Sequence, residues 1–190
     1  MSIKHIHKNI CEKHILGPET RTYVVRADGS DTREWLHDSP ICSCLNDLRV
    51  AHCGIMHALQ PFEIARVHLS GTFFFACIEG EGQVLIDGDW RTVGAGQACV
   101  QPPFIPNGLK ARGRKVWKFC WIRYQEAPST QPLVSLHAPA IGEFDVEPLR
   151  FAIEGLHAEA SRAASLHALR KWTDLVHNYV LLFARPVRGG

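Results

Sequence analysis

Short apolar runs separated by glycine and proline fill residues 21–125, and they constrain the fold more than any other feature. Asp87-Gly88 between two of these runs indicates a hairpin, because this pair readily adopts the positive φ angles of a type I′ turn. Several short strands at near-regular spacing predict an antiparallel barrel or sandwich. The runs occupy residues 63–69, 72–78, 83–86, 90–93, 97–101 and 115–124.

The pattern changes to a helical one near residue 147. Apolar residues recur at steps of three and four in residues 148–160 and again in residues 166–184, which predicts two helices. Pro148 suits the first turn of a helix, and Arg185-Pro186 ends the second one. Proline and small residues between the two compositions indicate a linker.

These changes divide the chain into five segments. They are an N-terminal arm (1–20), a barrel (21–127), a linker (128–146), a helical segment (147–185) and the start of a second linker (186–190).

Composition excludes several classes of protein. Hydrophobic residues make up 46% and charged residues 21%, which is typical of a folded chain and not of a disordered one. The 21 basic and 19 acidic residues give a net charge of +2, which does not indicate a nucleic-acid surface. The apolar runs are too short to span a membrane, and no secretory leader is visible. We therefore expect a cytoplasmic protein whose seven cysteines are reduced.

Residues 79–88 and 94–103 look like parts of a cupin barrel. The first cupin motif reads G-x5-H-x-H-x4-E-x6-G, and Gly80 matches its last glycine. The two histidine positions then fall on Arg66 and His68, the carboxylate on Phe73, and the first glycine on Gln60.

The second cupin motif reads G-x5-P-x-G-x2-H-x3-N. Gly96 and Pro102 match it, whereas its second glycine falls on Phe104, its histidine on Asn107 and its asparagine on Ala111. Cupin enzymes hold iron, manganese, nickel or zinc with imidazoles and a carboxylate. Because His68 is the one such ligand kept, we expect a barrel with no metal and no cofactor.

A metal-free cupin followed by a linker and two helices resembles the N-terminal effector-binding and dimerisation domain of AraC-type transcription regulators. Residues 102–107 (Pro-Pro-Phe-Ile-Pro-Asn) and 117–124 are similar in style to that domain. The resemblance implies a non-enzymatic sensor that binds a small-molecule effector in the barrel and forms a homodimer through its last helix. DNA binding would then belong to a separate C-terminal domain that this chain lacks, with residues 186–190 as a linker cut short.

The predicted ligand-binding residues combine charge with aromatic walls. By alternation, Arg66 and His68 share one side of their strand, and a buried arginine needs an anion. That anion is either a group on the effector or a protein carboxylate such as Glu63 or Glu79. Trp117, Phe119 and Trp121 share a face and either wall a ligand cavity or fill the barrel. The predicted ligand-binding set is Arg66, His68, Asn107, Trp117 and Trp121.

The last helix has an apolar stripe wide enough for two contacts, one with its own domain and one with a partner helix. The alternative is that it packs on the barrel alone. The residues predicted to dimerise are Leu169, Trp172, Val176, Tyr179 and Phe183.

Two other functions stay open. Cys42, Cys44, Cys53 and His57 could form a zinc or thiol sensor. Their spacing lacks paired C-x2-C knuckles, however, so buried strand cysteines are the favoured explanation. A stand-alone cupin isomerase or oxygenase would require at least three converging metal ligands.

Overall fold

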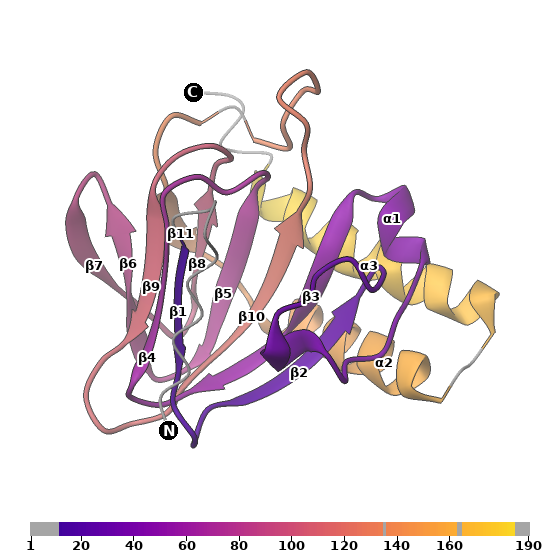
Figure 1. The fold of residues 1–190 in the computed structure, drawn as a ribbon, viewed down its shortest axis with the longest axis horizontal. Coiled ribbons are helices and arrows are strands. Elements are labelled where there is room, and N and C mark those ends of the chain that lie inside the picture. Colours follow the sequence, from indigo (N-terminus) through magenta and orange to yellow (C-terminus); the bar gives the residue numbers. More distant parts are fainter. Residues whose placement is uncertain (1–11, 135, 163–164, 185–190) are drawn as a thin grey trace.

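The computed structural model describes residues 12–134, 136–162 and 165–184. Two antiparallel sheets face each other, and two helices cover the outer side of the larger sheet (Figure 1). The predicted fold class, an antiparallel β-barrel of two sheets followed by two α-helices, is confirmed.

Each sheet is antiparallel throughout. The smaller one has the strand order β1 (Glu12–Leu16), β4 (Phe62–Arg66), β9 (Asn107–Ala111), β6 (Glu81–Ile86) and β7 (Asp89–Gly94). The larger one has the order β11 (Ala140–Glu143), β8 (Gln97–Gln101), β5 (Phe73–Glu79), β10 (Trp117–Tyr124), β3 (Val50–Ala58) and β2 (Arg21–Arg26).

The helices occur at two places along the chain, between β2 and β3 and after β11. The connection from β2 to β3 contains the 3-10 turn η1 (Glu34–Leu36) and the short helix α1 (Cys44–Asp47). The chain then ends with α2 (Glu147–Ser161) and α3 (Leu166–Ala184), near the ranges that the helical periodicity predicts. No helix in the described part of the chain is long and apolar enough to cross a membrane.

Strand β5 separates two hydrophobic cores by simple alternation. Phe73, Phe75 and Cys77 point between the sheets, whereas Phe74 and Ala76 point to the helices. Because β5 is buried on both sides, its sequence is a continuous apolar run. We call the cluster between the two sheets the inner core, and it consists of aromatic and aliphatic side chains. We call the cluster between the larger sheet and the helices the outer core.

Gly88 and Gly54 show two different reasons why this fold needs glycine. At the predicted hairpin between β6 and β7, Asp87 and Gly88 have φ angles of 51° and 87°, as a type I′ turn demands. Gly54 lies beside Trp121 across the β3–β10 pair, and a Cβ there would be 2.8 Å from Cη2 of the indole. The indole of Trp121 therefore lies against β3 only because residue 54 has no side chain.

Two strands correct the predicted segment boundaries. β1 lies inside the predicted arm (1–20) and pairs along its whole length with β4. β11 lies inside the predicted linker (128–146) and pairs with β8. Both strands are short, with five and four residues, so their alternation is too brief to identify them in the sequence. The segment 186–190 lies outside the described residues.

The stripe of α3 that was predicted to dimerise packs against its own domain. Val176 is buried in the outer core, and the other four residues pack against that core. Trp172 contacts Phe151 of α2, and Phe183 contacts Phe74 of β5. The alternative interpretation of the stripe, packing on the barrel, therefore accounts for these side chains, and a homodimer stays a prediction.

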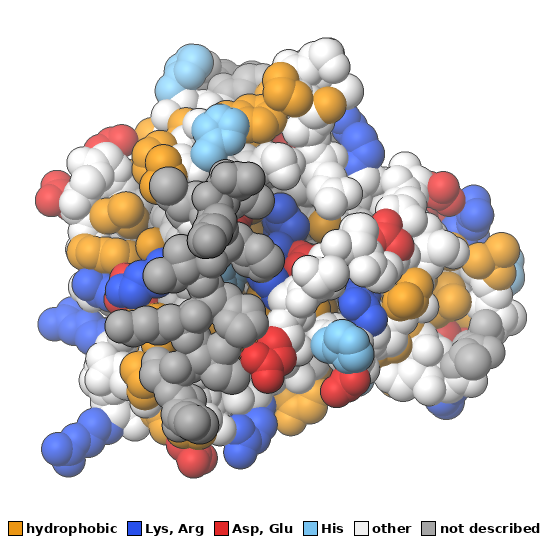
Figure 2. Space-filling view, in the orientation of Figure 1, with side chains coloured by type: hydrophobic (Ala, Val, Ile, Leu, Met, Phe, Trp, Pro, Cys, Tyr) orange, Lys and Arg blue, Asp and Glu red, His pale blue; other side chains and the backbone are white. Residues whose placement is uncertain are grey.

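The surface has no charged face of one sign in the view of Figure 2, where basic and acidic side chains are interspersed. Hydrophobic side chains are visible at the end formed by the C-terminal helices. Phe151 and Leu166 are 64% and 58% exposed in this region. On this face, the mixture of charges matches the balanced composition.

Candidate ligand-binding site

A row of buried residues crosses the larger sheet at one end of the barrel. His52 of β3 is paired with Arg123 of β10, and Arg123 is paired on its other side with Phe73 of β5. Phe73 is in turn paired with Gln101 of β8. Side chains that are paired in this way share a face of the sheet. Phe73 belongs to the inner core, so the whole row points into the barrel.

A second row crosses the smaller sheet and faces the first. Glu12 of β1 lies beside Arg66 of β4, and Arg66 lies beside Asn107 of β9. Arg66 alternates with Phe62 and Ile64, which are both in the inner core, so this row also points inward. We name the six polar members of the two rows the polar ring: Glu12, His52, Arg66, Gln101, Asn107 and Arg123.

The connection between β2 and β3 lies against the ring. Arg33 donates from Nε to Asp31 Oδ1 at 2.8 Å, and its Nη1 lies 3.6 Å from Glu12 Oε2. Asp31 also lies 3.6 Å from Arg123 Nη1. Each of these four side chains is less than one fifth exposed. The ring is therefore joined to a loop by buried ion pairs.

Two tryptophans border His52. Trp121 donates from Nε1 to His52 Nδ1 at 2.9 Å, and the ring centre of Trp35 is 5.9 Å from that of His52. Because Nδ1 accepts a hydrogen bond, the neutral imidazole carries its proton on Nε2. Burial, with the charges on Arg123 and Arg33, holds the pKa of His52 well below its usual value. His52 is therefore a neutral donor.

Two side chains of β1, Glu12 and His14, each have a lowered pKa and keep one charge state around neutral pH. Burial opposes ionisation of Glu12, but the hydrogen bond from His14 at 3.0 Å and the charges on Arg66 and Arg33 outweigh it, so its pKa is about 2. Burial lowers the pKa of His14 to about 4, and the same two arginines add to this effect. At neutral pH, Glu12 is an anion and His14 is uncharged.

Arg66 is the most isolated charge in the barrel. It is 3% exposed, and its guanidinium carbon lies 5.0 Å from the ring centre of Phe73. Burial, followed by the nearby charge of Arg33, lowers its pKa to about 9. Its Nε and Nη1 have no hydrogen-bond partner among the described residues.

Unpaired polar atoms concentrate at this end of the barrel. Ten buried side-chain nitrogen and oxygen atoms have no hydrogen-bond partner among the described residues. A buried atom of this kind costs about 1–3 kcal/mol, and native proteins keep few of them. They belong to five members of the polar ring (His52, Arg66, Gln101, Asn107 and Arg123) and to His14, Arg33 and Trp35. The polar ring therefore carries buried polar atoms that no described residue satisfies.

The structure brings three of the five predicted ligand-binding residues to this end. Arg66, Asn107 and Trp121 lie at the polar ring, as described above. Trp117 lies deeper in the barrel, where its Nε1 donates to Cys77 Sγ at 3.3 Å, so it fills the core. His68 is exposed and does not point inward, because β4 ends at Arg66 and the alternation stops there.

Neither protein carboxylate that was considered as a partner for Arg66 fulfils that role. Glu63 pairs with Lys13 at 3.0 Å, and Glu79 pairs with Lys118 at 2.6 Å. Glu63 occupies the opposite face of β4 from the inner-core residues Phe62 and Ile64, so it points outward. Glu79 is the last residue of β5, where the pairing with β10 shifts register, and its side chain is 64% exposed.

The sequence interpretation missed most of the polar ring. Glu12 and His52 lie on strands that it did not predict, and Gln101 is the last residue of one that it did. Arg123 carried a usable signal, because it alternates with Trp121 and Phe119 on the face predicted to be internal.

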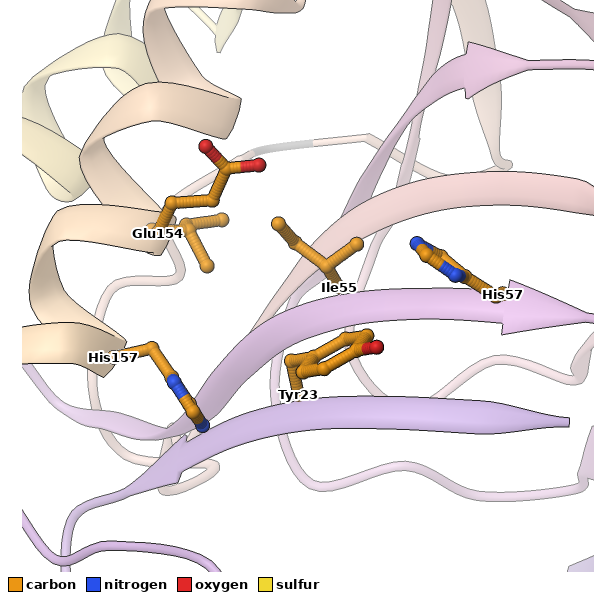
Figure 3. Close-up of a pocket in the computed structure, with 6 residues that line it drawn as sticks. Tyr23, Ile55, His57, Glu154 and His157 are labelled. Carbon is orange, nitrogen blue, oxygen red and sulfur yellow. The ribbon is translucent and has the colours of Figure 1, made fainter. Parts of the chain in front are cut away.

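The cysteines of the proposed metal or thiol sensor are buried beside one another in the outer core. Burial raises the pKa of Cys42 to about 11, with Cys44 close enough to contribute, and raises that of Cys53 further. The fourth candidate, His57, is four residues along β3 from Cys53 and faces a groove between β3 and α2 (Figure 3). The four residues therefore do not converge.

That groove has a volume of about 270 Å³. Tyr23 lies between the two histidines that line it, with ring centres 5.4 Å from His57 and 6.2 Å from His157 (Figure 3). Tyr23 is 46% exposed, so the groove is open to solvent. Unlike the polar ring, it is therefore not lined mainly by buried residues.

The residues at the cupin metal positions do not fit a metal. Of the four residues that the motif spacing puts at ligand positions, the structure brings Arg66, Phe73 and Asn107 together, whereas His68 is exposed beyond the end of β4. An arginine repels a cation, a phenyl ring cannot bind one, and an amide is a weak ligand for transition metals. No group of three His, Cys, Asp or Glu side chains in the described residues could hold a metal ion.

Comparisons with known proteins found partial structural similarities. No family model matches the sequence, and comparison with curated proteins gave no match. A cupin domain of an XRE family transcriptional regulator from Enterobacter cloacae is 18% identical, with a TM-score of 0.40, over 47% of this chain and 95% of that one.

Two other similar structures are named as enzymes. A predicted oxalate decarboxylase from Thermotoga maritima is 14% identical, with a TM-score of 0.39, over 42% of this chain and 70% of that one. A salicylate 1,2-dioxygenase from Pseudaminobacter salicylatoxidans is 16% identical, with a TM-score of 0.39, over 57% of this chain and 27% of that one. At these values the similarities carry no argument about function, which has to come from the chain's own residues.

Proposed function

We propose that this chain is the ligand-sensing domain of a transcription regulator of the AraC type, with a small molecule bound at the polar ring. One observation carries the proposal. Where a cupin enzyme holds a metal, this barrel has Arg66, Phe73 and Asn107, surrounded by buried polar atoms that lack partners among the described residues. Such a site can bind and recognise a polar molecule, but it lacks the ligands for metal catalysis.

A sensor also needs a route from its ligand to the rest of the protein, and strand β10 offers one. Arg123 points into the barrel, and the next residue, Tyr124, is on the outer side, where its hydroxyl lies 2.9 Å from His177 of α3. The pairing of β10 with β3 shifts register between these two residues. A ligand that moves Arg123 would therefore act on the contact that fixes α3.

The loop between β2 and β3 offers a second route. Its Asp31 and Arg33 pair with ring residues, and further along it α1 contacts α3 through an ion pair of 3.4 Å between Asp47 and Arg170. In the proposed function, DNA binding belongs to a different domain, and α3 passes the ligand-dependent change to it. The homodimer of the AraC type is part of this proposal.

Thermal denaturation in the presence of a library of small polar metabolites tests the proposal. A ligand that binds the folded state alone raises Tm in a concentration-dependent way. The matched control is the library on Arg66→Met protein, where compounds that bind the polar ring lose their effect. Elemental analysis of the same wild-type sample separates the enzymatic alternative, since stoichiometric iron or manganese together with no Tm shift would contradict a sensor.

A further inference from the structure

Arg66 has no ion-pair partner in the part of the chain that the structure describes. No carboxylate oxygen among the described residues lies within 4.0 Å of its guanidinium. This observation is complete for side chains, because every Asp and Glu of the sequence lies in the described residues. Buried arginines are normally paired, since an isolated buried charge is costly.

The charges around the ring do not balance. Arg33, Arg66 and Arg123 contribute three positive charges, and Glu12 and Asp31 contribute two negative ones. The other buried carboxylate, Glu126, accepts hydrogen bonds from Thr72 and Leu133 away from these arginines. One positive charge is left without a counter-charge.

The two histidines do not change this balance at neutral pH. Burial and the adjacent arginines lower the pKa of His14 and of His52, so both are uncharged. Phe73 also adds none, although the face of its ring stabilises the guanidinium of Arg66. A molecule that balanced the site would therefore carry a single negative charge.

The amides beside Arg66 indicate what else the molecule carries. Asn107 donates from Nδ2 to the carbonyl oxygen of Ile105 at 3.4 Å, which leaves Oδ1 free to accept a hydrogen bond. Gln101 has neither its Oε1 nor its Nε2 paired among the described residues. Both side chains can accept from a hydroxyl group.

We propose that the ligand is a hydroxy-substituted monocarboxylate, whose carboxylate pairs with Arg66 and whose hydroxyl donates to Asn107 or Gln101. The inference rests on the proposed function and names the chemical class of its ligand. Dicarboxylates and phosphate esters carry a second charge that the site cannot balance, and neutral sugars leave Arg66 unpaired.

Titration calorimetry with matched compounds tests the inference. The probes are 3-hydroxybutyrate and 4-hydroxybenzoate, each compared with its primary amide, together with malate as a dicarboxylate. We expect at least one monocarboxylate to bind wild-type protein, and its amide to bind roughly 10–100-fold more weakly, as the loss of a charge-assisted hydrogen bond implies.

Two variants locate the binding. Arg66→Met replaces the charged side chain by an apolar one of similar length. We expect it to weaken binding of the carboxylate roughly as much as replacing the carboxylate by its primary amide weakens binding to wild-type protein. Arg162→Met makes the same change on the surface, at a side chain that is 70% exposed, and should leave the affinity unchanged. Circular dichroism establishes that both variants are folded. If Arg66→Met does not fold, the comparison of acid with amide on wild-type protein decides alone.

The outcomes separate the two proposals. Equal binding of acid and amide, or undiminished binding by folded Arg66→Met, overturns the monocarboxylate and leaves a sensor with another ligand. Tighter binding of malate overturns the charge argument in the same way. If metabolites of every class fail to bind wild-type protein, the proposed function itself is wrong.

Discussion

The hydroxyl of Tyr124 lies 2.9 Å from Nδ1 of His177, so a single hydrogen bond joins the central strand of the larger sheet to helix α3. Both side chains are largely removed from solvent, and burial lowers the pKa of His177, so its ring is neutral at pH 7. Because Arg123 precedes Tyr124 and points into the barrel, this bond lies one residue from the polar ring.

Tyr124→Phe should loosen α3. Loss of one buried hydrogen bond lowers the free energy of unfolding by about 1 kcal/mol. Amide hydrogen exchange in α3 should accelerate more than exchange in β5. Tyr179→Phe is the matched control, because the hydroxyl of Tyr179 has no hydrogen bond in the described structure that this change could remove. Equal exchange in the two variants would show that the Tyr124 bond does not hold the helix.

The protein should lose stability between pH 6.5 and pH 4. The pKa of His14 is about 4 in the folded state, whereas its ordinary value is 6.5. Between these two values the imidazole is protonated in the unfolded chain but neutral in the folded one, so acid favours unfolding. For His14 alone, lowering the pH from 7 to 5 costs about 2 kcal/mol, and His52 acts in the same direction.

Chemical denaturation at pH 7 and at pH 5 measures this loss. His14→Gln should reduce the difference between the two pH values, whereas His37→Gln, at an exposed position, should leave it unchanged. The depressed pKa of Glu12, about 2, extends the loss of stability below pH 4.5, because the ionised carboxylate is the form that the folded state stabilises. A flat stability profile from pH 7 to pH 5 would rule out a neutral buried His14.

Arg66→Met should stabilise the ligand-free protein while it removes binding. An unpaired buried charge is replaced by an apolar side chain that can pack on Phe73, and comparable exchanges contribute about 1–4 kcal/mol. Glu12→Gln should do the opposite and destabilise by about 3 kcal/mol, because it leaves three arginines with one carboxylate. Urea denaturation of both variants without ligand measures the two signs, and a less stable Arg66→Met would contradict the charge imbalance.

Gly82→Ala should be strongly destabilising, because a Cβ at residue 82 would lie 2.3 Å from Cε3 of the buried Trp117. Overpacking of this kind costs about 1–3 kcal/mol. Gly29→Ala is the control, since a Cβ at residue 29 meets no atom within 4 Å. Thermal denaturation compares the two, and equal Tm values would mean that Trp117 has room to move.

The buried thiols should be inert in the folded protein. Burial raises the pKa of Cys42 and of Cys77 to about 11, so little thiolate forms at pH 7.5. In a Cys11→Ser background, a thiol reagent such as Ellman's reagent should react only as fast as the protein unfolds. Rapid reaction at Cys42 or Cys44, or protection by stoichiometric zinc, would instead favour the sensor of metal or oxidants.

The barrel could be predicted from sequence because its strongest signals are local. The alternation in residues 115–124 and the Asp87-Gly88 turn depend only on neighbouring residues, and both are confirmed. Strand β3 escaped prediction although it has nine residues. It is buried on both faces and contains Gly54 beside a tryptophan and His52 in the polar ring, so its pattern is neither alternating nor uniformly apolar.

The site could be predicted only in part, for a different physical reason. Motif spacing identified Arg66 and Asn107, and the pairing of β4 with β9 places these two residues side by side. His52 and Gln101 come from strands that meet through pairing across β10 and β5, which one sequence does not reveal. Glu63 and Glu79 were predicted as possible partners of Arg66, but strand alternation points Glu63 outward, and Glu79 lies at the exposed end of β5 beside a register shift.

Strand β11 has one more effect. Without it, the edge of β8 would present unpaired backbone groups, which are a template for association with another chain. β11 pairs with that edge and is only four residues long, with Glu143 at its end and Gly142 under Phe183. Short, charged edges resist further strand addition. The segment between barrel and helices therefore protects the domain against aggregation through its larger sheet.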